Sequence, residues 1–143
     1  MIRHTVRALC AASLVIAPLA LSTPAHAAVT CTVNGIAVSG TTVNGTSGSD
    51  FIRCGGLAPT DSVNGLGGND FILVTGAVGG IVSGGAGSDY VQADAGTTGS
   101  GQVLGNADGD YLSVGPNAGS TNGGTGLDFC RVASGNPPVN CEF

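Results

Sequence analysis

An internal repeat runs through most of this chain and limits what it can fold into. Five eight-residue segments each have a glycine first, an aspartate sixth and an aromatic residue seventh. The segments are GTSGSDFI at 45–52, GLGGNDFI at 65–72, GGAGSDYV at 84–91, GNADGDYL at 105–112 and GGTGLDFC at 123–130. Self-similarity at such a period is typical of a solenoid, in which each repeat forms one coil stacked on the next.

The spacing of the repeats predicts their local structure. The repeat aspartates are separated by 20, 19, 21 and 18 residues, and they are Asp50, Asp70, Asp89, Asp110 and Asp128. A second column precedes each leading glycine by two residues and consists of Val43, Val63, Val82, Val103 and Thr121. Each coil therefore contains two short extended segments separated by glycine-rich turns, which suits parallel β structure. Helix is disfavoured, because glycine costs about 1 kcal/mol relative to alanine in a helix interior.

We therefore expect an all-β fold, a parallel β-roll or β-solenoid of about five coils with a period of 18–21 residues. A competing fold uses the Asn-Gly steps at 34, 44, 64 and 122 as two-residue hairpin turns of an antiparallel domain. Hairpins do not explain why acids and aromatic residues recur together in each repeat.

The first 27 residues have the features of a secretory signal peptide. A basic start with Arg3 and Arg7 precedes an apolar run, and Ala25-His26-Ala27 is a small-x-small cleavage site. Lipid attachment at Cys10 or Cys31 is the weaker alternative. We expect residues 1–27 to be removed, 28–42 to form an N-terminal cap, 43–131 the repeats and 132–143 a C-terminal cap. The mature protein is expected to be secreted and extracellular.

Charge excludes several functions. Removal of Arg3 and Arg7 changes the net charge from −5 to −7, and Arg53 and Arg131 are then the only basic residues. So acidic a chain is not expected to bind nucleic acid, and no segment after the signal is apolar enough for membrane insertion. Both histidines lie in the signal. A histidine-dependent hydrolase and a zinc site are therefore excluded, and we predict no enzymatic activity.

Four cysteines remain after the signal, two near each end of the repeats. An even number of cysteines in a secreted chain predicts disulfides. Of the three connectivities we favour Cys31–Cys54 with Cys130–Cys141, which closes the two ends; free buried thiols are the alternative.

The repeats resemble the calcium-binding nonapeptides of RTX (haemolysin-type) proteins, GGxGxDxUx, where U is a large aliphatic residue. GGAGSDYVQ at 84–92 matches every specified position. The resemblance implies that the first six residues turn and bind Ca²⁺, that the last three form a strand, and that each ion lies between successive turns. It also implies a ligand set of the five repeat aspartates with the leading glycines Gly45, Gly65, Gly84, Gly105 and Gly123.

Two departures from the family pattern change the expectation. In RTX rolls both halves of a coil carry the motif, whereas here the intervening halves lack it, so a single row of about four Ca²⁺ ions is implied. The fourth repeat has Asn106 and Asp108 where the motif has glycine. Asp108 is either an extra metal ligand or a residue of a left-handed turn, and we favour the turn.

Charge repulsion links the cation to folding. Equivalent residues of stacked coils lie about 4.8 Å apart, so the aspartates repel one another unless cations separate them. We expect calcium to drive or stabilise coil stacking. The alternative is a calcium-independent ladder held by the disulfides.

A column of aromatic residues follows the aspartates: Phe51, Phe71, Tyr90, Tyr111 and Phe129. If the next residue points into the core, these side chains point outward. They either stack on one another for stability or form a recognition face for a cell-surface glycan or a protein partner. A secreted adhesion or carbohydrate-binding module, with calcium only structural, is therefore the alternative function.

Overall fold

The computed structural model describes residues 28–143, and the predicted signal peptide lies outside them. Twelve strands and no helix make up this part of the chain. The strands are β1 (Val29–Val33), β2 (Ile36–Gly40), β3 (Thr42–Asn44), β4 (Phe51–Cys54), β5 (Ser62–Gly67), β6 (Phe71–Val74), β7 (Ile81–Ala86), β8 (Tyr90–Ala93), β9 (Gln102–Ala107), β10 (Tyr111–Asn117), β11 (Ser120–Thr125) and β12 (Phe129–Gly135).

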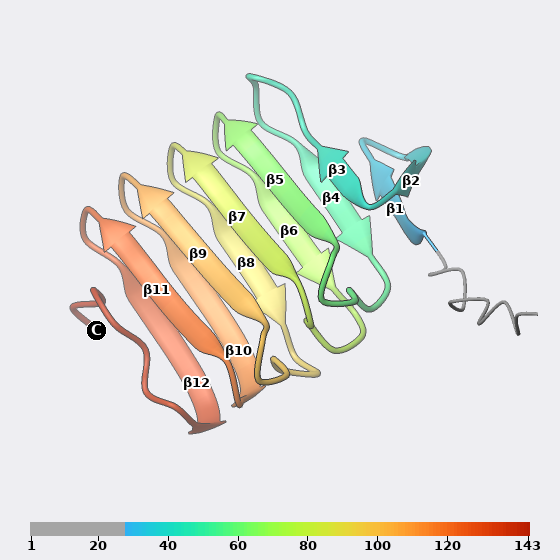
Figure 1. The fold of residues 1–143 in the computed structure, drawn as a ribbon. Coiled ribbons are helices and arrows are strands. Elements are labelled where there is room, and N and C mark those ends of the chain that lie inside the picture. The colour runs from blue at the N-terminus through green and yellow to red at the C-terminus, as the bar shows by residue number, and fades with distance from the viewer. Residues whose placement is uncertain (1–27) are drawn as a thin grey trace, which may run out of the picture.

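The strands form two sheets that face each other across a narrow core (Figure 1). The first sheet has the order β12-β10-β8-β6-β4-β1-β2, and the second has the order β11-β9-β7-β5-β3. Every pairing between two of the strands β3 to β12 is parallel and joins strands one coil apart. The predicted all-β parallel β-solenoid of about five coils is therefore confirmed, and the antiparallel hairpin domain is excluded.

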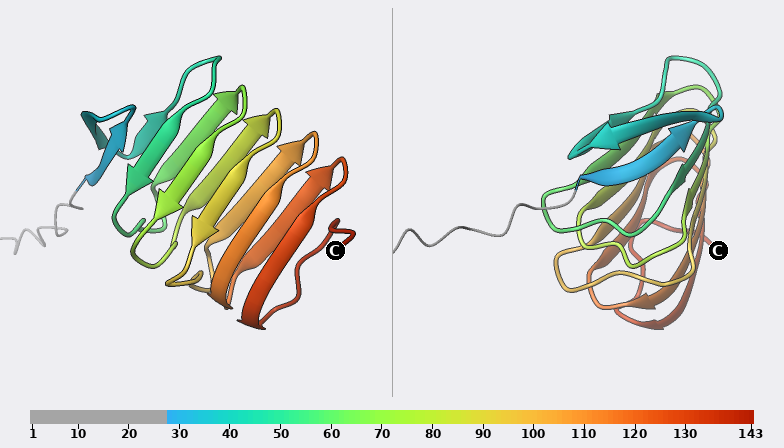
Figure 2. Two further views of the ribbon diagram at one scale, coloured as in Figure 1. Left: turned by 180° about the vertical axis from the view of Figure 1, so that it is seen from behind. Right: turned by 90° about the vertical axis from the view of Figure 1, so that its right-hand side faces the viewer.

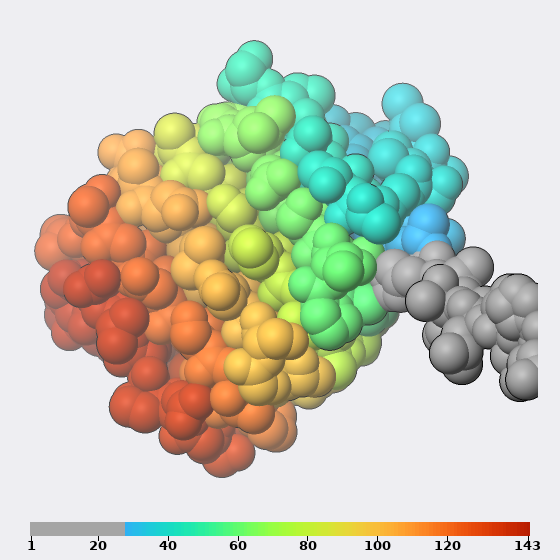
Figure 3. Space-filling view, viewed as in Figure 1, coloured from blue at the N-terminus to red at the C-terminus, as the bar shows by residue number. Residues whose placement is uncertain are grey.

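The strand register places equivalent repeat positions side by side. Phe51 pairs with Phe71 and Ile52 with Ile72, for example, and the same alignment continues along the sheet. Figure 3 shows the coils as successive bands of colour from one end of the molecule to the other. A third, shorter row of isolated bridges joins Leu57, Val78, Thr97 and Asn117 on successive coils.

The core consists of the columns that the sequence predicted to point inward. Val43, Val63, Val82 and Val103 of the second sheet are fully buried, and Ile52, Ile72, Val91 and Leu112 meet them from the first sheet. Thr121 takes the last valine position and is equally buried. The first sheet adds a second buried column two residues further along its strands, made of Cys54, Val74, Ala93 and Val114. These small and medium side chains fill the space between the sheets, so the coil is thin.

The N-terminal end is closed by an antiparallel hairpin (Figure 2). Asn34 and Gly35 form its turn with φ of 51° and 80°, the left-handed pair that a two-residue hairpin requires. Strand β1 also pairs antiparallel with β4. This pairing places Cys31 opposite Cys54, and the two form the predicted disulfide. Of the four Asn-Gly steps only this one makes a hairpin, since those at 44, 64 and 122 lie in or at the end of parallel strands.

The C-terminal end is closed by residues 136–143, here called the tail, which pass beside β11 and β12. The second predicted disulfide, Cys130–Cys141, joins the tail to β12. The ends of the solenoid thus carry different caps, a hairpin at one end and a cross-linked tail at the other.

Candidate functional site

The five repeat aspartates form a single buried column. Each stands immediately before a strand of the first sheet, at the turn where the chain crosses from one sheet to the other. Their relative exposures are 4% for Asp50, 3% for Asp70, 3% for Asp89, 4% for Asp110 and 0% for Asp128. Aspartates are seldom this buried without partners, so the hydrogen bonds of each oxygen decide what the column can do.

One carboxylate oxygen of each aspartate is used to join neighbouring coils. The Asp50 N–H donates to Asp70 Oδ1 at 2.8 Å, and the Asp70 N–H donates to Asp89 Oδ1 at 2.8 Å. The next two coils repeat the bond at the same distance, through Asp110 and Asp128. The column is therefore a continuous ladder in which each aspartate binds the backbone of the coil before it.

Two residues that the sequence reasoning missed complete this ladder at its ends. At the N-terminal end the side chain of Asn34 is both donor and acceptor. Its amide nitrogen donates to Asp50 Oδ1 at 2.5 Å, and its oxygen accepts from the Phe51 N–H at 2.9 Å. At the C-terminal end the Asp128 N–H donates to Glu142 Oε2 at 2.7 Å. Asn34 was recognisable only as a turn residue, and Glu142 follows Asp128 by 14 residues, outside the repeat period.

The second carboxylate oxygen distinguishes the later coils. The Oδ2 atoms of Asp70, Asp89, Asp110 and Asp128 are buried and have no hydrogen-bond donor. Behind each lies a leading glycine of the repeat, and a Cβ on Gly65 would collide with both Asp70 Oδ2 and the Gly84 carbonyl oxygen. The same crowding recurs at Gly84, Gly105 and Gly123. In each later coil a buried carboxylate oxygen without a donor therefore lies near a backbone carbonyl oxygen of the next segment, and a proton or a cation there would satisfy the carboxylate.

The first coil differs, because both Asp50 oxygens have donors. The Thr46 N–H donates to Asp50 Oδ2 at 2.6 Å, and the Thr46 hydroxyl donates to the same oxygen at 3.0 Å. Thr46 stands where the third and fifth repeats have a second glycine. Although Gly45 belongs to the predicted ligand set, the carboxylate beside it needs no cation.

The pKa values of the aspartates follow these contacts. Donation from Thr46 holds the pKa of Asp50 below its ordinary value, although burial opposes it. Burial raises the pKa of Asp70, and it raises the pKa of Asp89 to about 6 and that of Asp110 to about 7. Backbone donation to the ladder oxygens lowers these last three values but does not outweigh burial. The negative charge is thus unfavourable at Asp70, Asp89 and Asp110.

The glycines lie differently from what the family resemblance implied. The first three residues of the later motifs extend the strands of the second sheet, as in β5 and β7, so only the following few residues turn. The leading glycines are needed because the carboxylate and a neighbouring backbone fill the space of a side chain. The carbonyl oxygens of Gly65, Gly84, Gly105 and Gly123 lie near the carboxylate of the preceding repeat.

Asp108 has the turn geometry that we favoured. Its φ of 73° is left-handed, and its carboxylate accepts a hydrogen bond from the Gly87 N–H of the preceding coil at 3.1 Å. Asn106 in the same turn has a φ of 86°.

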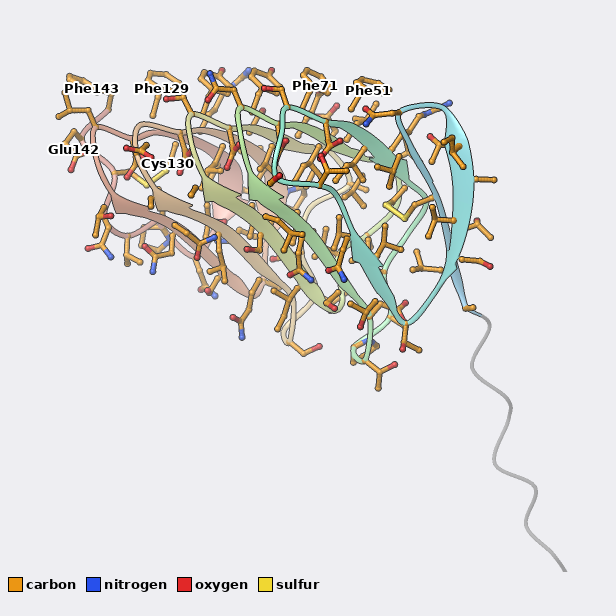
Figure 4. The ribbon with its side chains drawn as sticks, turned by 90° about the horizontal axis from the view of Figure 1, so that it is seen from above. Phe51, Phe71, Phe129, Cys130, Glu142 and Phe143 are labelled. Atoms are coloured by element: carbon orange, nitrogen blue, oxygen red, sulfur yellow. A yellow bond between two sulfur atoms is a disulfide. The ribbon has the colours of Figure 1, made fainter. Side chains whose placement is uncertain are left out.

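The aromatic column forms a stack on the outside of the first sheet (Figure 4). Ring centroids of neighbouring coils lie 4.8 to 5.3 Å apart, and their planes differ by 3° to 18°. The end residues Phe51 and Phe129 are 47% and 41% exposed, and Phe71, Tyr90 and Tyr111 are partly buried. Most ring faces therefore contact another ring, and the stack presents mainly ring edges to solvent.

Between residues 28 and 143, no group of three or more His, Cys, Asp or Glu side chains is placed to hold a metal ion. A cation in this ladder would depend on one carboxylate oxygen per coil together with backbone carbonyls. The same stretch has no helix long and apolar enough to cross a membrane.

The fold and site define a disulfide-linked parallel β-solenoid with an internal aspartate ladder that suggests ion binding. No protein-family model, curated protein or solved structure matches the chain.

Proposed function

We propose that this protein is a secreted calcium-binding β-roll, in which a single row of Ca²⁺ ions lies along the aspartate ladder and stabilises the stacked coils. One observation carries the proposal: four buried Oδ2 atoms lack a donor, and each lies beside a backbone carbonyl oxygen of the next segment. The resemblance to RTX repeats supports it independently.

The donor set favours calcium over other metals. Its members are carboxylate and carbonyl oxygens, and residues 28–143 contain no histidine, while all four cysteines there are in disulfides. Ca²⁺ takes six to eight oxygens in flexible geometry and accepts backbone carbonyls, whereas Mg²⁺ requires a strict octahedron and retains water. A spacing set by β-strand stacking suits the more tolerant ion.

A bound cation would neutralise the Oδ2 atoms without disturbing the ladder. Oδ1 of each aspartate remains bonded to the preceding coil, so a loaded site adds to the stacking that already exists. The free energy of binding becomes free energy of folding, about 2.7 kcal/mol per site when free calcium is 100 times its dissociation constant. The disulfides suit the oxidising, extracellular or periplasmic location in which calcium is abundant.

Other roles have less support. Sugar recognition uses the faces of aromatic rings, and here the faces are occupied by stacking. The proposed function involves no catalysis, and a glycan or protein partner is not needed for it.

The test is a calcium titration of the purified protein after chelation, followed by calorimetry and by thermal unfolding in far-UV circular dichroism. We expect uptake of Ca²⁺ with a large rise in the unfolding temperature, and a much smaller effect of Mg²⁺ at equal concentration. Asp89→Asn should reduce the stoichiometry of uptake, because it removes the charge of one site. Absence of heat and an unchanged unfolding temperature at millimolar calcium would overturn the proposal and leave protons as the partners of the Oδ2 atoms.

A further inference from the structure

We infer that the tail completes the last cation site of the row, and that the Cys130–Cys141 disulfide holds this site together. The inference rests on the proposed function. It assigns a binding role to a segment that lies outside the repeats and contains none of their motif.

The tail occupies the place of a sixth coil beside the second sheet. The Val139 N–H donates to the Thr121 carbonyl at 3.0 Å, and the Gly123 N–H donates to the Val139 carbonyl at 3.0 Å. The side chain of Asn140 donates to Asn122 at 2.9 Å, as that of Asn64 does to Asn44 at the other end of the sheet. These are the contacts that one coil makes with the next.

The tail then reaches the first sheet within a few residues. The Glu142 N–H donates to the Asp128 carbonyl at 2.9 Å, and the Cys130 N–H donates to the Phe143 carbonyl at 2.9 Å. Figure 4 shows Phe143 beyond Phe129 in the aromatic row, with Glu142 and Cys130 nearby. The extra methylene of glutamate lets its carboxylate reach the Asp128 N–H from this shortened path.

In the inner coils a carboxylate Oδ2 lies near a glycine carbonyl oxygen of the next coil. At this end the carbonyl oxygen comes from the tail instead. A Cβ on Gly123 would collide with the Asn140 carbonyl oxygen and would lie 2.7 Å from Asp128 Oδ2. Asp128 is fully buried, and its Oδ2 has no donor. The tail therefore supplies the carbonyl oxygen that the next coil supplies elsewhere.

This arrangement shifts the row of four proposed sites by one coil toward the C-terminus, relative to the four gaps between the five repeats. The gap between the first and second coils needs no cation, because Thr46 satisfies Asp50 Oδ2. Four sites remain, at Asp70, Asp89, Asp110 and Asp128, and the last lies between the fifth coil and the tail. The expected number of about four ions is unchanged, but one of them depends on residues 136–143.

The disulfide is placed where this site needs it. Cys141 stands between Asn140, which provides the carbonyl, and Glu142, which ends the ladder. The tail contains no strand of its own and much of it is exposed, so the cross-link adds to the hydrogen bonds of Val139, Asn140 and Glu142 in fixing the position of the Asn140 carbonyl. We expect the site to lose its affinity when the cross-link is absent.

Two matched pairs of variants test the inference through calcium stoichiometry, measured by calorimetry and equilibrium dialysis. Cys130→Ser with Cys141→Ser should bind one ion fewer than wild type, whereas Cys31→Ser with Cys54→Ser at the hairpin end should bind the same number. Asp128→Asn should also lose one ion and Asp50→Asn none. Asp128→Asn keeps an oxygen for the Asp110 N–H and is expected to fold even if a cysteine pair is essential.

The outcomes separate this inference from the proposed function. Wild-type protein that takes up no calcium overturns both. Wild-type uptake that is unchanged in the Cys130/Cys141 variant, or in Asp128→Asn, overturns the tail site and leaves calcium binding by the inner coils intact. A loss in Asp50→Asn equal to that in Asp128→Asn would also overturn it, since the first gap would then be a site.

Discussion

The first coil and the three inner coils of Asp70, Asp89 and Asp110 contain the same aspartate in the same turn, but the pKa of that aspartate is shifted in opposite directions. Asp50 has donors on both oxygens, and its pKa is lowered, chiefly by the Thr46 N–H. Asp110 has the same low solvent exposure but a donor on one oxygen only, the Asp89 N–H, and burial raises its pKa to about 7. The repeat therefore fixes where a carboxylate lies, and its neighbours fix whether that carboxylate is stable as an anion.

A single motif position and one residue of the hairpin supply the donors that Asp50 has and the later aspartates lack. The residue after the leading glycine is left-handed in later coils, with φ of 80° at Leu66 and 86° at Asn106, whereas Thr46 keeps a negative φ. The Thr46 N–H and hydroxyl then face the carboxylate, and Asn34 adds a third donor. The first coil thus satisfies both oxygens of its carboxylate with protein donors, while each later coil leaves one carboxylate oxygen without a donor.

The largest consequence is expected in the pH dependence of the chelated protein. The raised pKa values of Asp70, Asp89 and Asp110 contribute stability that is complete below the unfolded value of 3.8 and is lost as pH rises through about 6 and about 7. Asp50 has the opposite sign, and its contribution is lost only as pH falls below 3.8. Urea unfolding in chelator should therefore show a falling midpoint from about pH 5 to about pH 8.

Saturating calcium is the control for this profile, because under the proposed function a cation at each Oδ2 would stabilise the charged form. The fall in the midpoint should then disappear. A chelated protein that is as stable at pH 8 as at pH 5 would show that the buried oxygens carry their charge without cost, and the contrast with Asp50 would be lost.

Much of the fold was predictable because the repeat determines it directly. A period near 19 residues, one inward side chain per short strand and cysteines at both ends led to the parallel solenoid and both disulfides. Side-chain alternation also predicted which column is outward, and the aromatic stack follows from it. These features depend on sequence neighbours and on the fixed spacing of stacked strands.

The charge state of the ladder was not predictable, because it depends on contacts between distant residues. Nothing in the sequence around Asn34 or Glu142 indicates that their side chains end the aspartate column, one from a hairpin and one from a shortened tail. The orientation of the carboxylates could not be predicted either. One oxygen accepts a hydrogen bond from the backbone of the preceding coil, and the other faces a glycine. A motif gives the position of a ligand but not which of its lone pairs are already used.

A smaller effect is expected from replacing one aspartate in each kind of coil by asparagine. In Asp110→Asn the amide oxygen can keep the bond from the Asp89 N–H. The amide nitrogen then replaces the orphaned oxygen with a donor that lies near the Gly123 carbonyl oxygen. In chelator at pH 8 this should raise the free energy of unfolding by about 1–3 kcal/mol. Asp50→Asn should lower it by about 1–2 kcal/mol, because an amide nitrogen would face the Thr46 donors.

Urea denaturation at one pH measures both asparagine variants, and circular dichroism checks that their folds are the same. Changes of the same sign in the two variants would contradict the comparison, since it predicts gain in one coil and loss in the other.

The smallest effect is expected at the motif position that separates the two kinds of coil. Leu66 is 51% exposed and has a φ of 80°, a conformation that costs a leucine about 1–2 kcal/mol. Leu66→Gly should therefore raise the free energy of unfolding by somewhat less, about 1 kcal/mol, because glycine also gains freedom in the unfolded chain. Thr46→Gly should lower it by about 1 kcal/mol, since the hydroxyl bond to Asp50 is lost. Urea denaturation in chelator compares the two; a stabilising Thr46→Gly would mean that the first coil gains nothing from its departure from the motif.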